Sequence, residues 1–378
     1  MPLRATKRGA ERTTLERDCD VLICGASFAG LAAARELAGS GARVLMIDRY
    51  EVGERQTSAC AIPTDWLRAL DVMGAHRQSF DEILVHTPWT STRWHVPWSF
   101  STFDYRELCA LLRAQGGELE FETATVERRS GNTVHTDRGE LRAPLILDAL
   151  GWRRVLSNGP TIQPPNAPLS RGLEVHPRGS AREMELWLDA SYVRAGYAWN
   201  FPAGDELRIG AGSFWPERHV KEPTVRLAGE LGMPAAGFQG NWIPHQLRAA
   251  IEDGVFFAGD SAGHCLPLTA EGIRTALYFG LAAGREMRLA HEGHKYVEQA
   301  VADYGAFSDS HASKFKTLLA LQRAVGQLTP SRSLTALVKS MRSRRFTAWG
   351  FRHYLGVAPP DFVRPIPDAA RVHVPTGR

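Results

Sequence analysis

Hydrophobic and polar residues follow two different patterns along the 378-residue chain. An apolar run near the N-terminus ends at Gly25, Ala and Leu then recur with helical spacing over residues 28–38, and a second apolar run begins after Arg43. This order predicts a buried strand, a tight turn, a helix and a second strand. Residues 171–213 instead alternate with the two-residue period of a half-buried strand, which predicts an antiparallel sheet.

Later segments return to the first pattern. We expect a helix over 103–117, a short buried strand within 143–152, and a strand followed by a long helix over 254–287. Helices are expected to continue to about residue 355. Length and pattern together favour two closely connected domains, one of α/β type and one dominated by an antiparallel sheet.

The composition is that of an ordinary globular protein, with 44% hydrophobic and 23% charged residues. No apolar stretch approaches the length of a spanning helix, and the polar N-terminus lacks the apolar core of a secretory signal. The five cysteines are dispersed without metal-ligand spacing, so we expect no metal site. Dispersed cysteines are typical of a reducing compartment, which predicts a cytoplasmic protein.

The first strand, turn and helix carry a glycine pattern, GASFAG at 25–30, and Asp48 ends the following strand. Gly25 permits the tight turn, Gly30 allows the helix to pack closely on the strand, and the free amides of the helix N-terminus can bind a pyrophosphate. Asp48 is placed to accept hydrogen bonds from adenosine ribose hydroxyls. Ser27 stands where the middle glycine is usual. The pattern predicts dinucleotide binding; a turn that needs glycines only for packing is the alternative.

A second strand–helix junction, GVFFAGDSAGHCLPLTAEGI at 254–273, has an aspartate at the strand end. Asp260 can accept hydrogen bonds from ribityl hydroxyls, and the helix that opens after Gly272 can place partial positive charge near the flavin N1–C2 carbonyl. This segment resembles the distal flavin motif of the hydroxylase-type FAD oxidoreductases. The resemblance implies FAD and an α/β fold of the glutathione-reductase and p-hydroxybenzoate-hydroxylase type. That fold joins a Rossmann-like FAD-binding domain to an antiparallel-sheet substrate domain, followed here by C-terminal helices.

A third motif, YAWNFP at 197–202, places aromatic side chains on one face of an expected strand. Period-two aromatics suit the buried face of a sheet and equally suit the wall of an apolar ligand site. The pattern Tyr-x-Trp-x-Phe-Pro resembles the geranylgeranyl reductase family, as does the segment from Gly53 to Cys60, which is similar to the family's segment ending in a cysteine beside the flavin. The resemblance covers about residues 19–285.

The family resemblance implies reduction of C=C bonds in an isoprenoid or similar apolar substrate by hydride from reduced FAD, with NAD(P)H or ferredoxin as electron donor. The sequence departs from the family pattern, because Ala61 follows the cysteine where the family usually has glycine. Leu150 precedes Gly151 where hydroxylases have an aspartate, which counts against a hydroxylase that uses NADPH in the usual way. The alternatives are an FAD-dependent monooxygenase or halogenase of a small secondary metabolite, an electron-relay flavoprotein, and a non-redox isoprenoid cyclisation assisted by FAD.

These patterns assign roles to individual residues. The expected cofactor contacts are Gly25, Ala26, Ser27, Ala29, Gly30, Asp48, Arg49, Arg55, Cys60, Ala61, Val126, Gly151, Gly259, Asp260, Pro267, Glu271, Gly272 and Ile273. The expected substrate contacts are Tyr197, Trp199, Phe201, Pro202 and His264. For His264 the alternative is a turn histidine that bonds to the backbone. The catalytic candidates are Cys60, Tyr197 and Trp199, with Cys60 as a proton donor, a redox thiol or a small packing residue.

The domain boundaries follow from the same motifs. We expect a disordered tail at 1–18, a discontinuous FAD-binding domain at 19–80, 101–160 and 245–300, a substrate domain at 81–100 and 161–244, and a C-terminal helical region and tail at 301–378.

The C-terminal region is strongly basic. No Asp or Glu occurs between Ser310 and Pro360, whereas the same stretch contains Lys314, Lys316, Arg323, Arg332, Lys339, Arg342, Arg344, Arg345 and Arg352. A solvated surface is one interpretation, and peripheral contact with anionic lipid or a diphosphate group is the other. Trp89, Trp94 and Trp98 likewise suit a core strand, a substrate channel or a membrane interface. Charge alone does not predict nucleic-acid binding, and the sequence does not predict the oligomeric state.

Overall fold

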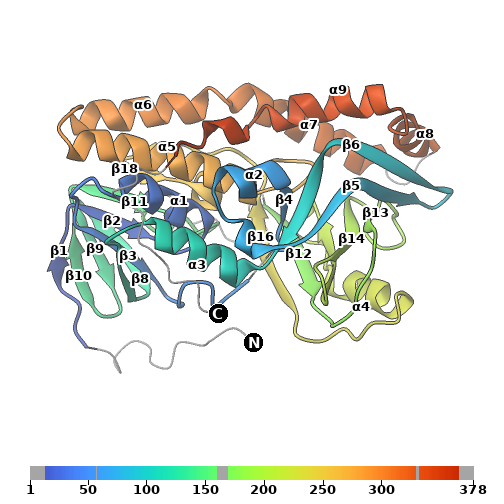
Figure 1. Cartoon of the computed structure of the whole chain (residues 1–378), viewed down its shortest axis with the longest axis horizontal. Coiled ribbons are helices and arrows are strands. Elements are labelled where there is room, and N and C mark those ends of the chain that lie inside the picture. The colour runs from blue at the N-terminus through green and yellow to red at the C-terminus, as the bar shows by residue number, and fades with distance from the viewer. Residues whose placement is uncertain (1–12, 57, 160–168, 329–331, 366–378) are drawn as a thin grey trace.

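The computed structural model describes residues 13–56, 58–159, 169–328 and 332–365. Within them the strands form three sheets (Figure 1). The six-stranded sheet has the order β17 (Ile251–Glu252), β18 (Val255–Phe257), β11 (Leu145–Asp148), β2 (Val21–Cys24), β3 (Val44–Asp48), β7 (Glu120–Thr123). Its strands are parallel except for β17, and short apolar runs such as VLIC suit strands buried on both faces.

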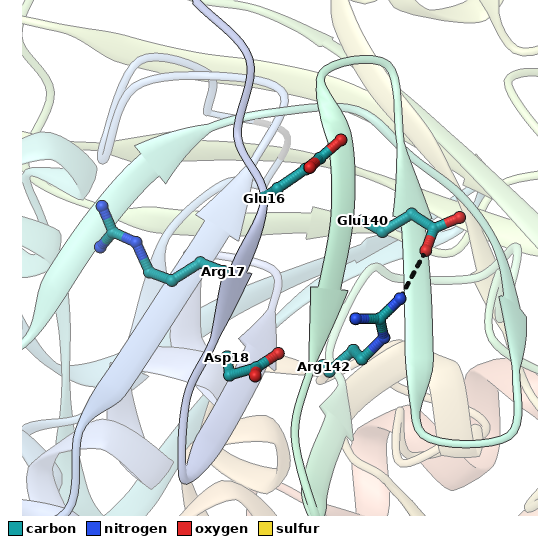
Figure 2. Close-up of a pocket in the computed structure, with 5 residues that line it drawn as sticks. All are labelled: Glu16, Arg17, Asp18, Glu140 and Arg142. Carbon is teal, nitrogen blue, oxygen red and sulfur yellow. Dashed lines mark hydrogen bonds and ion pairs between the residues drawn. The ribbon is translucent and has the colours of Figure 1, made fainter.

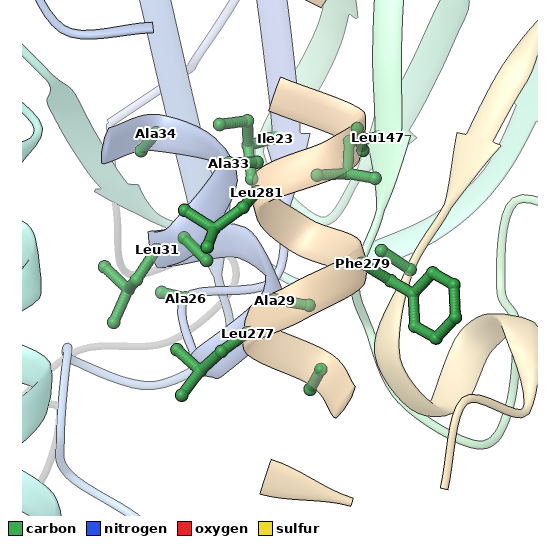
Figure 3. Close-up of a cluster of buried hydrophobic side chains, with 14 of the residues drawn as sticks. Ile23, Ala26, Ala29, Leu31, Ala33, Ala34, Leu147, Leu277, Phe279 and Leu281 are labelled. Atoms are coloured by element: carbon green, nitrogen blue, oxygen red, sulfur yellow. The ribbon is translucent and has the colours of Figure 1, made fainter. Parts of the chain in front are cut away.

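Helices cover the six-stranded sheet. The helices of the described residues, including those that do not cover this sheet, are α1 (Phe28–Leu37), α2 (Thr64–Ala69), α3 (Tyr105–Gln115), α4 (Lys221–Glu230), α5 (Ile273–His291), α6 (Val297–Asp309), α7 (Ala312–Leu328), α8 (Arg332–Ser340) and α9 (Arg344–Leu355). Short 3-10 turns are η2 (Met73–Ala75), η3 (Gly259–Ala262) and η4 (Pro360–Phe362). Figure 3 shows α1 and α5 side by side, with Ala29, Ala33 and Leu281 between them.

The close approach of α1 and α5 depends on two glycines. A methyl group at Gly280 would lie 2.3 Å from the carbonyl oxygen of Ala29, and one at Gly284 would lie 2.5 Å from that of Ala33. Helix backbones can come this close only where a side chain is missing. Because α1 starts at the first glycine turn and α5 at the second, this contact brings the two predicted cofactor motifs together.

The eight-stranded sheet carries the aromatic motif. Its order is β16 (Gln239–Pro244), β12 (Leu169–Val175), β15 (Leu207–Ser213), β14 (Gly196–Pro202), β13 (Met184–Trp187), β5 (His76–Thr87), β6 (Thr90–Phe103), β4 (Ala61–Pro63). Side chains of β14 alternate between its faces: Ala198 packs with Leu227 of α4, whereas Phe201 packs with Val338 of α8. The face that carries the aromatic side chains is therefore turned away from α4.

The remaining four-stranded sheet has the order β1 (Arg17–Asp18), β10 (Gly139–Arg142), β9 (Thr133–Thr136), β8 (Val126–Ser130). It corrects the expected disordered tail at 1–18, because β1 pairs with β10 and Leu15 is buried. An apolar side chain at Leu15 and backbone pairing give these residues the contacts that a disordered tail lacks. Residues 1–12 lie outside the described part.

Other expectations differ in detail. The large sheet includes β4 and the start of β5, which we assigned to the FAD-binding segment 19–80, and it contains one parallel pair, β13 with β5.

The Pro-rich segment at 160–168 and the tail at 366–378 lie outside the described residues. Helices reach Leu355, as the sequence predicted. Among the described residues, no helix combines the length and the apolar character needed to cross a membrane.

Candidate flavin site

The first turn is built around glycines that the backbone itself requires. Gly25 has φ +115°, and a methyl group there would lie 2.2 Å from the carbonyl oxygen of Ala149. A methyl group at Gly30 would lie 1.9 Å from the carbonyl oxygen of Gly25. Ser27 is the N-cap of α1 but makes no capping bond; its Oγ accepts a hydrogen bond from Tyr105 at 3.2 Å. The first amides of α1 therefore have no side-chain cap, as an anion site requires.

Asp48 lies at the end of β3, beside this turn. Its carboxylate accepts hydrogen bonds from the amides of Ala26 at 2.9 Å and Tyr50 at 3.1 Å, and burial raises its pKa above the usual value. Arg49 and Arg55 are exposed, and their guanidinium groups lie 4.9 and 5.3 Å from the centre of the Tyr50 ring. These two residues place positive charge next to the aspartate that we expect to bind adenosine.

The second turn contains a carboxylate without a partner. Gly259 has φ +65°, and a methyl group there would lie 3.2 Å from Cβ of Ala29 on α1. Within the described part of the chain, the side chain of Asp260 accepts no hydrogen bond, and burial raises its pKa to about 6. A desolvated carboxylate is costly unless something donates to it. The hydroxyl groups of a bound ligand would donate hydrogen bonds to this carboxylate.

The loop after η3 is strained and held from outside. Leu268 and Ala270 have φ values of 71° and 52°, a region that residues with side chains seldom adopt. The amide of Leu268 donates to Gln322 of α7 at 2.8 Å, and Thr269 Oγ1 lies 2.8 Å from the hydroxyl of Tyr354 on α9. Such strain persists only where surrounding contacts fix it, and it is concentrated at functional sites.

Glu271 and its neighbours anchor this loop. The carboxylate of Glu271 accepts hydrogen bonds from Arg274 at 2.7 and 2.8 Å and from the Tyr354 hydroxyl. Its side chain is thus engaged by protein groups, and its carbonyl oxygen accepts a hydrogen bond from the Leu266 amide at 3.0 Å, which leaves its own amide for the expected cofactor contact. Gly272 precedes α5 without a capping side chain, and Ile273 begins the helix.

Three residues that the sequence analysis missed connect the two turns. Asp148, at the end of β11, accepts hydrogen bonds from Ser261 Oγ at 2.6 Å and from two amides that follow it. Ser261 also accepts from the amide of Gly151 at 3.1 Å, and Arg154 donates to the carbonyl of Ser261. An acid at the end of a buried strand was the signal that could have identified Asp148.

The aromatic motif reaches the second turn. The hydroxyl of Tyr197 donates to the carbonyl oxygen of Thr269 in the strained loop. The Trp199 indole is 9% exposed, lies over Gly210 and Gly212, and donates to Glu174 at 3.3 Å. Packing on the sheet is therefore shown for Trp199, and its role as a ligand wall stays a prediction.

Cys60 lies in a buried polar cluster near this wall. It has φ 52°, and Arg208 donates to the carbonyl oxygens of Ala59 at 2.7 Å and Cys60 at 3.3 Å. Burial raises the pKa of the Cys60 thiol well above its usual value; Arg208 opposes this rise and Glu174 adds to it. Cys60 is thus a protonated thiol at neutral pH, which suits a proton donor or a packing residue better than a thiolate nucleophile.

The remaining candidates lie in packing positions. His264 is fully buried, stacks on Phe279 at 3.7 Å, and contacts Ser308 of α6, so its ring lies between α5 and α6. This placement favours a structural role over the substrate contact that we expected. The carbonyl of Pro202 accepts from Thr102, and Val126 is buried at the start of β8. Pro267 is also buried, and Ala61 begins β4.

A charged pocket elsewhere on the surface is separate from the candidate flavin site. Figure 2 shows this pocket of about 290 Å³, lined by Glu16, Arg17 and Asp18 together with Glu140 and Arg142. Glu140 and Arg142 form an ion pair at 3.1 Å, and the lining residues belong to or adjoin strands of the four-stranded sheet. Neither flavin motif contributes a residue to it.

Comparisons with known proteins agree with this geometry. The FAD binding domain family matches residues 18–133. Digeranylgeranylglycerophospholipid reductase 3 from Methanosphaera stadtmanae is 26% identical over 359 residues, which cover 81% of this chain and 86% of the relative. Geranylgeranyl diphosphate reductase from Rhodobacter capsulatus is 26% identical over 340 residues, covering 80% and 83%.

The chain is an FAD-dependent oxidoreductase related to the geranylgeranyl reductases.

Solved structures show the same fold. A geranylgeranyl bacteriochlorophyll reductase-like protein from Thermoplasma acidophilum matches with a TM-score of 0.78 at 17% identity, covering 92% of this chain and 98% of that one. A probable FAD-dependent monooxygenase from Pseudomonas aeruginosa matches with a TM-score of 0.60 at 19% identity, covering 90% and 99%. Reductase-like and monooxygenase-like proteins thus share the fold of this oxidoreductase.

The residues of the two turns fit FAD. Gly25 and Gly30 leave no space for side chains where a pyrophosphate must approach the backbone, and the amides of α1 lack a side-chain cap. Asp260 is a desolvated acceptor without a donor among the described residues. In this oxidoreductase Asp48 would hold the adenosine ribose and Asp260 the ribityl chain.

Proposed function

We propose that this oxidoreductase reduces C=C bonds of an isoprenoid or a similar apolar substrate. Bound FAD, once reduced, would supply the hydride. The observation that carries the proposal is the bond from Tyr197 to Thr269, because it joins the aromatic face of β14 to the loop of the second flavin motif. The names of the relatives, at 23–26% identity over most of the chain, support the same substrate class.

The aromatic face suits an alkene substrate for physical reasons. Tyr197 and Trp199 lie 5.8 Å apart by ring centres, and Trp199 and Phe201 lie 6.4 Å apart, so the three rings form a continuous apolar surface. Burial of apolar area contributes about 25 cal/mol per Å². A prenyl chain can bind almost only through its apolar surface. Exclusion of water from such a site also protects a reduced flavin from side reactions.

Reduction also requires a proton, and the chain holds acids next to this face. Glu174 is buried beside Trp199, and its Oε1 lies 2.9 Å from Nε2 of His176. His176 also lies 3.5 Å from the partly exposed Glu206, so the charged cluster extends toward solvent. In the proposed reaction Cys60 or Glu174 donates the proton.

The proposal is tested by incubating the FAD-loaded, dithionite-reduced protein with prenyl diphosphates and prenylated lipids, and measuring product mass. We expect gains in steps of two hydrogens. Trp199→Ala should slow the reaction, whereas the matched control Trp187→Ala, on the α4 side of the same sheet, should not. No mass gain with any substrate would refute the proposal, and a long-lived C4a-peroxyflavin spectrum in oxygen would favour a monooxygenase.

The electron donor and the proton source need separate measurements. Anaerobic bleaching of the flavin by NADPH, NADH or reduced ferredoxin identifies the donor, and we propose that one of these reduces the enzyme. In heavy water each reduced bond should gain one deuterium from the proton donor and a second from flavin N5, whose hydrogen comes from solvent when dithionite is the reductant. Glu174→Gln should slow this incorporation without weakening FAD binding; equal loss of both would instead assign Glu174 a structural role.

A further inference from the structure

The C-terminal helices combine positive charge with exposed apolar side chains. The stretch from Ser310 to Pro360 contains nine Lys and Arg residues and no Asp or Glu. Within the described residues none of the nine forms an ion pair with a carboxylate. Figure 1 shows α7 and α9 as an outer layer of the molecule, with α8 at its end.

Helix α9 presents an aromatic pair to solvent. Trp349 is 61% exposed and Phe346 is 39% exposed, and their rings stack with centres 6.0 Å apart. Arg345, Arg352 and His353 are also exposed, and at 3.6 residues per turn they fall on the same side of the helix as Trp349. Two large aromatic rings flanked by cations thus form one face of α9.

The neighbouring helices also carry exposed apolar side chains. Leu321 and Leu328 on α7 and Leu337 on α8 are between 45% and 49% exposed. Among the described residues, half of the ten large hydrophobic side chains that are exposed lie in α7–α9. Single exposed apolar residues are ordinary on a protein surface, but a concentration in one region marks an interaction site.

The opposite side of α9 is packed against the rest of the molecule. Phe351 contacts the rings of Trp94 and Trp98 on β6, and Tyr354 bonds to Glu271 and Thr269 in the second flavin loop. The helix is therefore fixed in place with its aromatic pair outward. Trp94 and Trp98 are used for this packing, which excludes them as free surface anchors.

We propose that the outer face of α7–α9, centred on Phe346 and Trp349, docks this enzyme on the surface of an anionic phospholipid bilayer. Cations attract anionic headgroups, Trp prefers the interface between water and hydrocarbon, and exposed leucines gain from contact with acyl chains. An acidic protein would satisfy the charges but not the apolar side chains. The inference does not depend on the proposed function, although docking would place a lipid-derived substrate on the outer side of the helix whose inner side bonds to the second flavin loop.

The test is co-sedimentation of the full-length, FAD-loaded protein with vesicles of phosphatidylcholine alone, or with about a third phosphatidylglycerol. The apolar variant is Phe346→Ser with Trp349→Ser, and its control is Phe238→Ser, which removes a phenylalanine of similar exposure (37%) near α4. The charge variant is Arg345→Gln with Arg352→Gln. Its control replaces two other exposed arginines, Arg178→Gln with Arg182→Gln.

We expect binding only to the anionic vesicles, weakened by salt, and at least tenfold weaker in both patch variants but unchanged in both controls. Unchanged thermal midpoints and FAD content establish that the variants are folded. Failure of the wild-type protein to bind anionic vesicles, equal binding to neutral vesicles, or wild-type binding by the patch variants would overturn the proposal. So would a concentration-dependent dimer lost in the apolar variant, or binding to RNA that needs only the arginines.

Discussion

The two turns of the candidate flavin site look alike in sequence, since each places a glycine and an aspartate at the end of a buried strand. Their hydrogen bonding differs. Asp48 accepts bonds from two backbone amides, whereas Asp260 accepts none within the described residues. The first turn is complete without a ligand, and the second contains a partly buried carboxylate to which no described residue donates a hydrogen bond.

This difference shows how similar motifs divide two tasks. The aspartate of the first turn accepts two backbone hydrogen bonds and is the residue that we expect to bind the cofactor, so its loss should affect both stability and FAD binding. The aspartate of the second turn lowers the stability of the ligand-free protein, because burying an unpaired carboxylate costs free energy. The strained backbone at Leu268 and Ala270, in the loop that follows this turn, also lowers the stability of the ligand-free protein.

Gly30→Ala should have the largest effect. Its methyl group would lie 1.9 Å from the carbonyl oxygen of Gly25, so the strand and α1 must separate. We expect a loss of about 3 kcal/mol or more in the free energy of unfolding, measured by urea denaturation, together with loss of FAD binding. Gly229→Ala in α4 is the control, since no atom lies within 4 Å of its added methyl group. Equal stability of the two variants would contradict the assigned packing.

Asp48→Ala and Asp260→Ala should differ in their effect on the stability of the ligand-free protein. Asp48→Ala leaves the amides of Ala26 and Tyr50 without an acceptor, which should cost about 2–4 kcal/mol in the ligand-free protein. Asp260→Ala removes no protein hydrogen bond and should leave that stability unchanged or raised. Both should weaken FAD binding, measured by titration. Equal destabilisation by the two substitutions would show that the turns do not differ as described.

The pH dependence of stability should identify Asp260 directly. Its pKa is raised from 3.8 to about 6, so between these values the folded protein keeps a proton that the unfolded chain has released. The free energy of unfolding of the ligand-free protein should therefore fall as pH rises through this window, by about 3 kcal/mol in total. Asp260→Asn should lack this component and be more stable than wild type at pH 8. Parallel curves for the two proteins would exclude the shift.

The sequence predicted the elements of this site better than their bonding. Strand, turn and helix near Gly25 and near Asp260 follow from local apolar runs and glycines, and local patterns determine such elements. The partners of Glu271 are remote in sequence: Tyr354 is 83 positions away, and only the packing of α9 on the second loop brings them together. The same holds for Tyr197 and Thr269, and for Arg208 behind Cys60.

His264 illustrates why residue type alone was insufficient. A histidine inside a flavin motif suggested contact with substrate, but the left-handed Gly263 before it turns the ring into the interior between α5 and α6. Burial lowers its pKa well below the usual value and keeps it neutral. A pattern of residue types does not record which way the backbone turns.

Substitutions at Ser27 should give the smallest effects and refine the description of the first turn. Its Oγ accepts a hydrogen bond from Tyr105, so its own proton remains free to donate to a phosphate. Ser27→Ala should lower FAD affinity a few-fold, about 1 kcal/mol, by removing that donor. Ser27→Gly should recover part of the loss, because the missing side chain lets the pyrophosphate approach the backbone. Since Ser27 makes no capping bond, both variants should unfold within about 1 kcal/mol of wild type. If neither changes FAD affinity, the phosphate is held by the amides of α1 alone, and the first turn depends on its backbone as the second depends on Asp260.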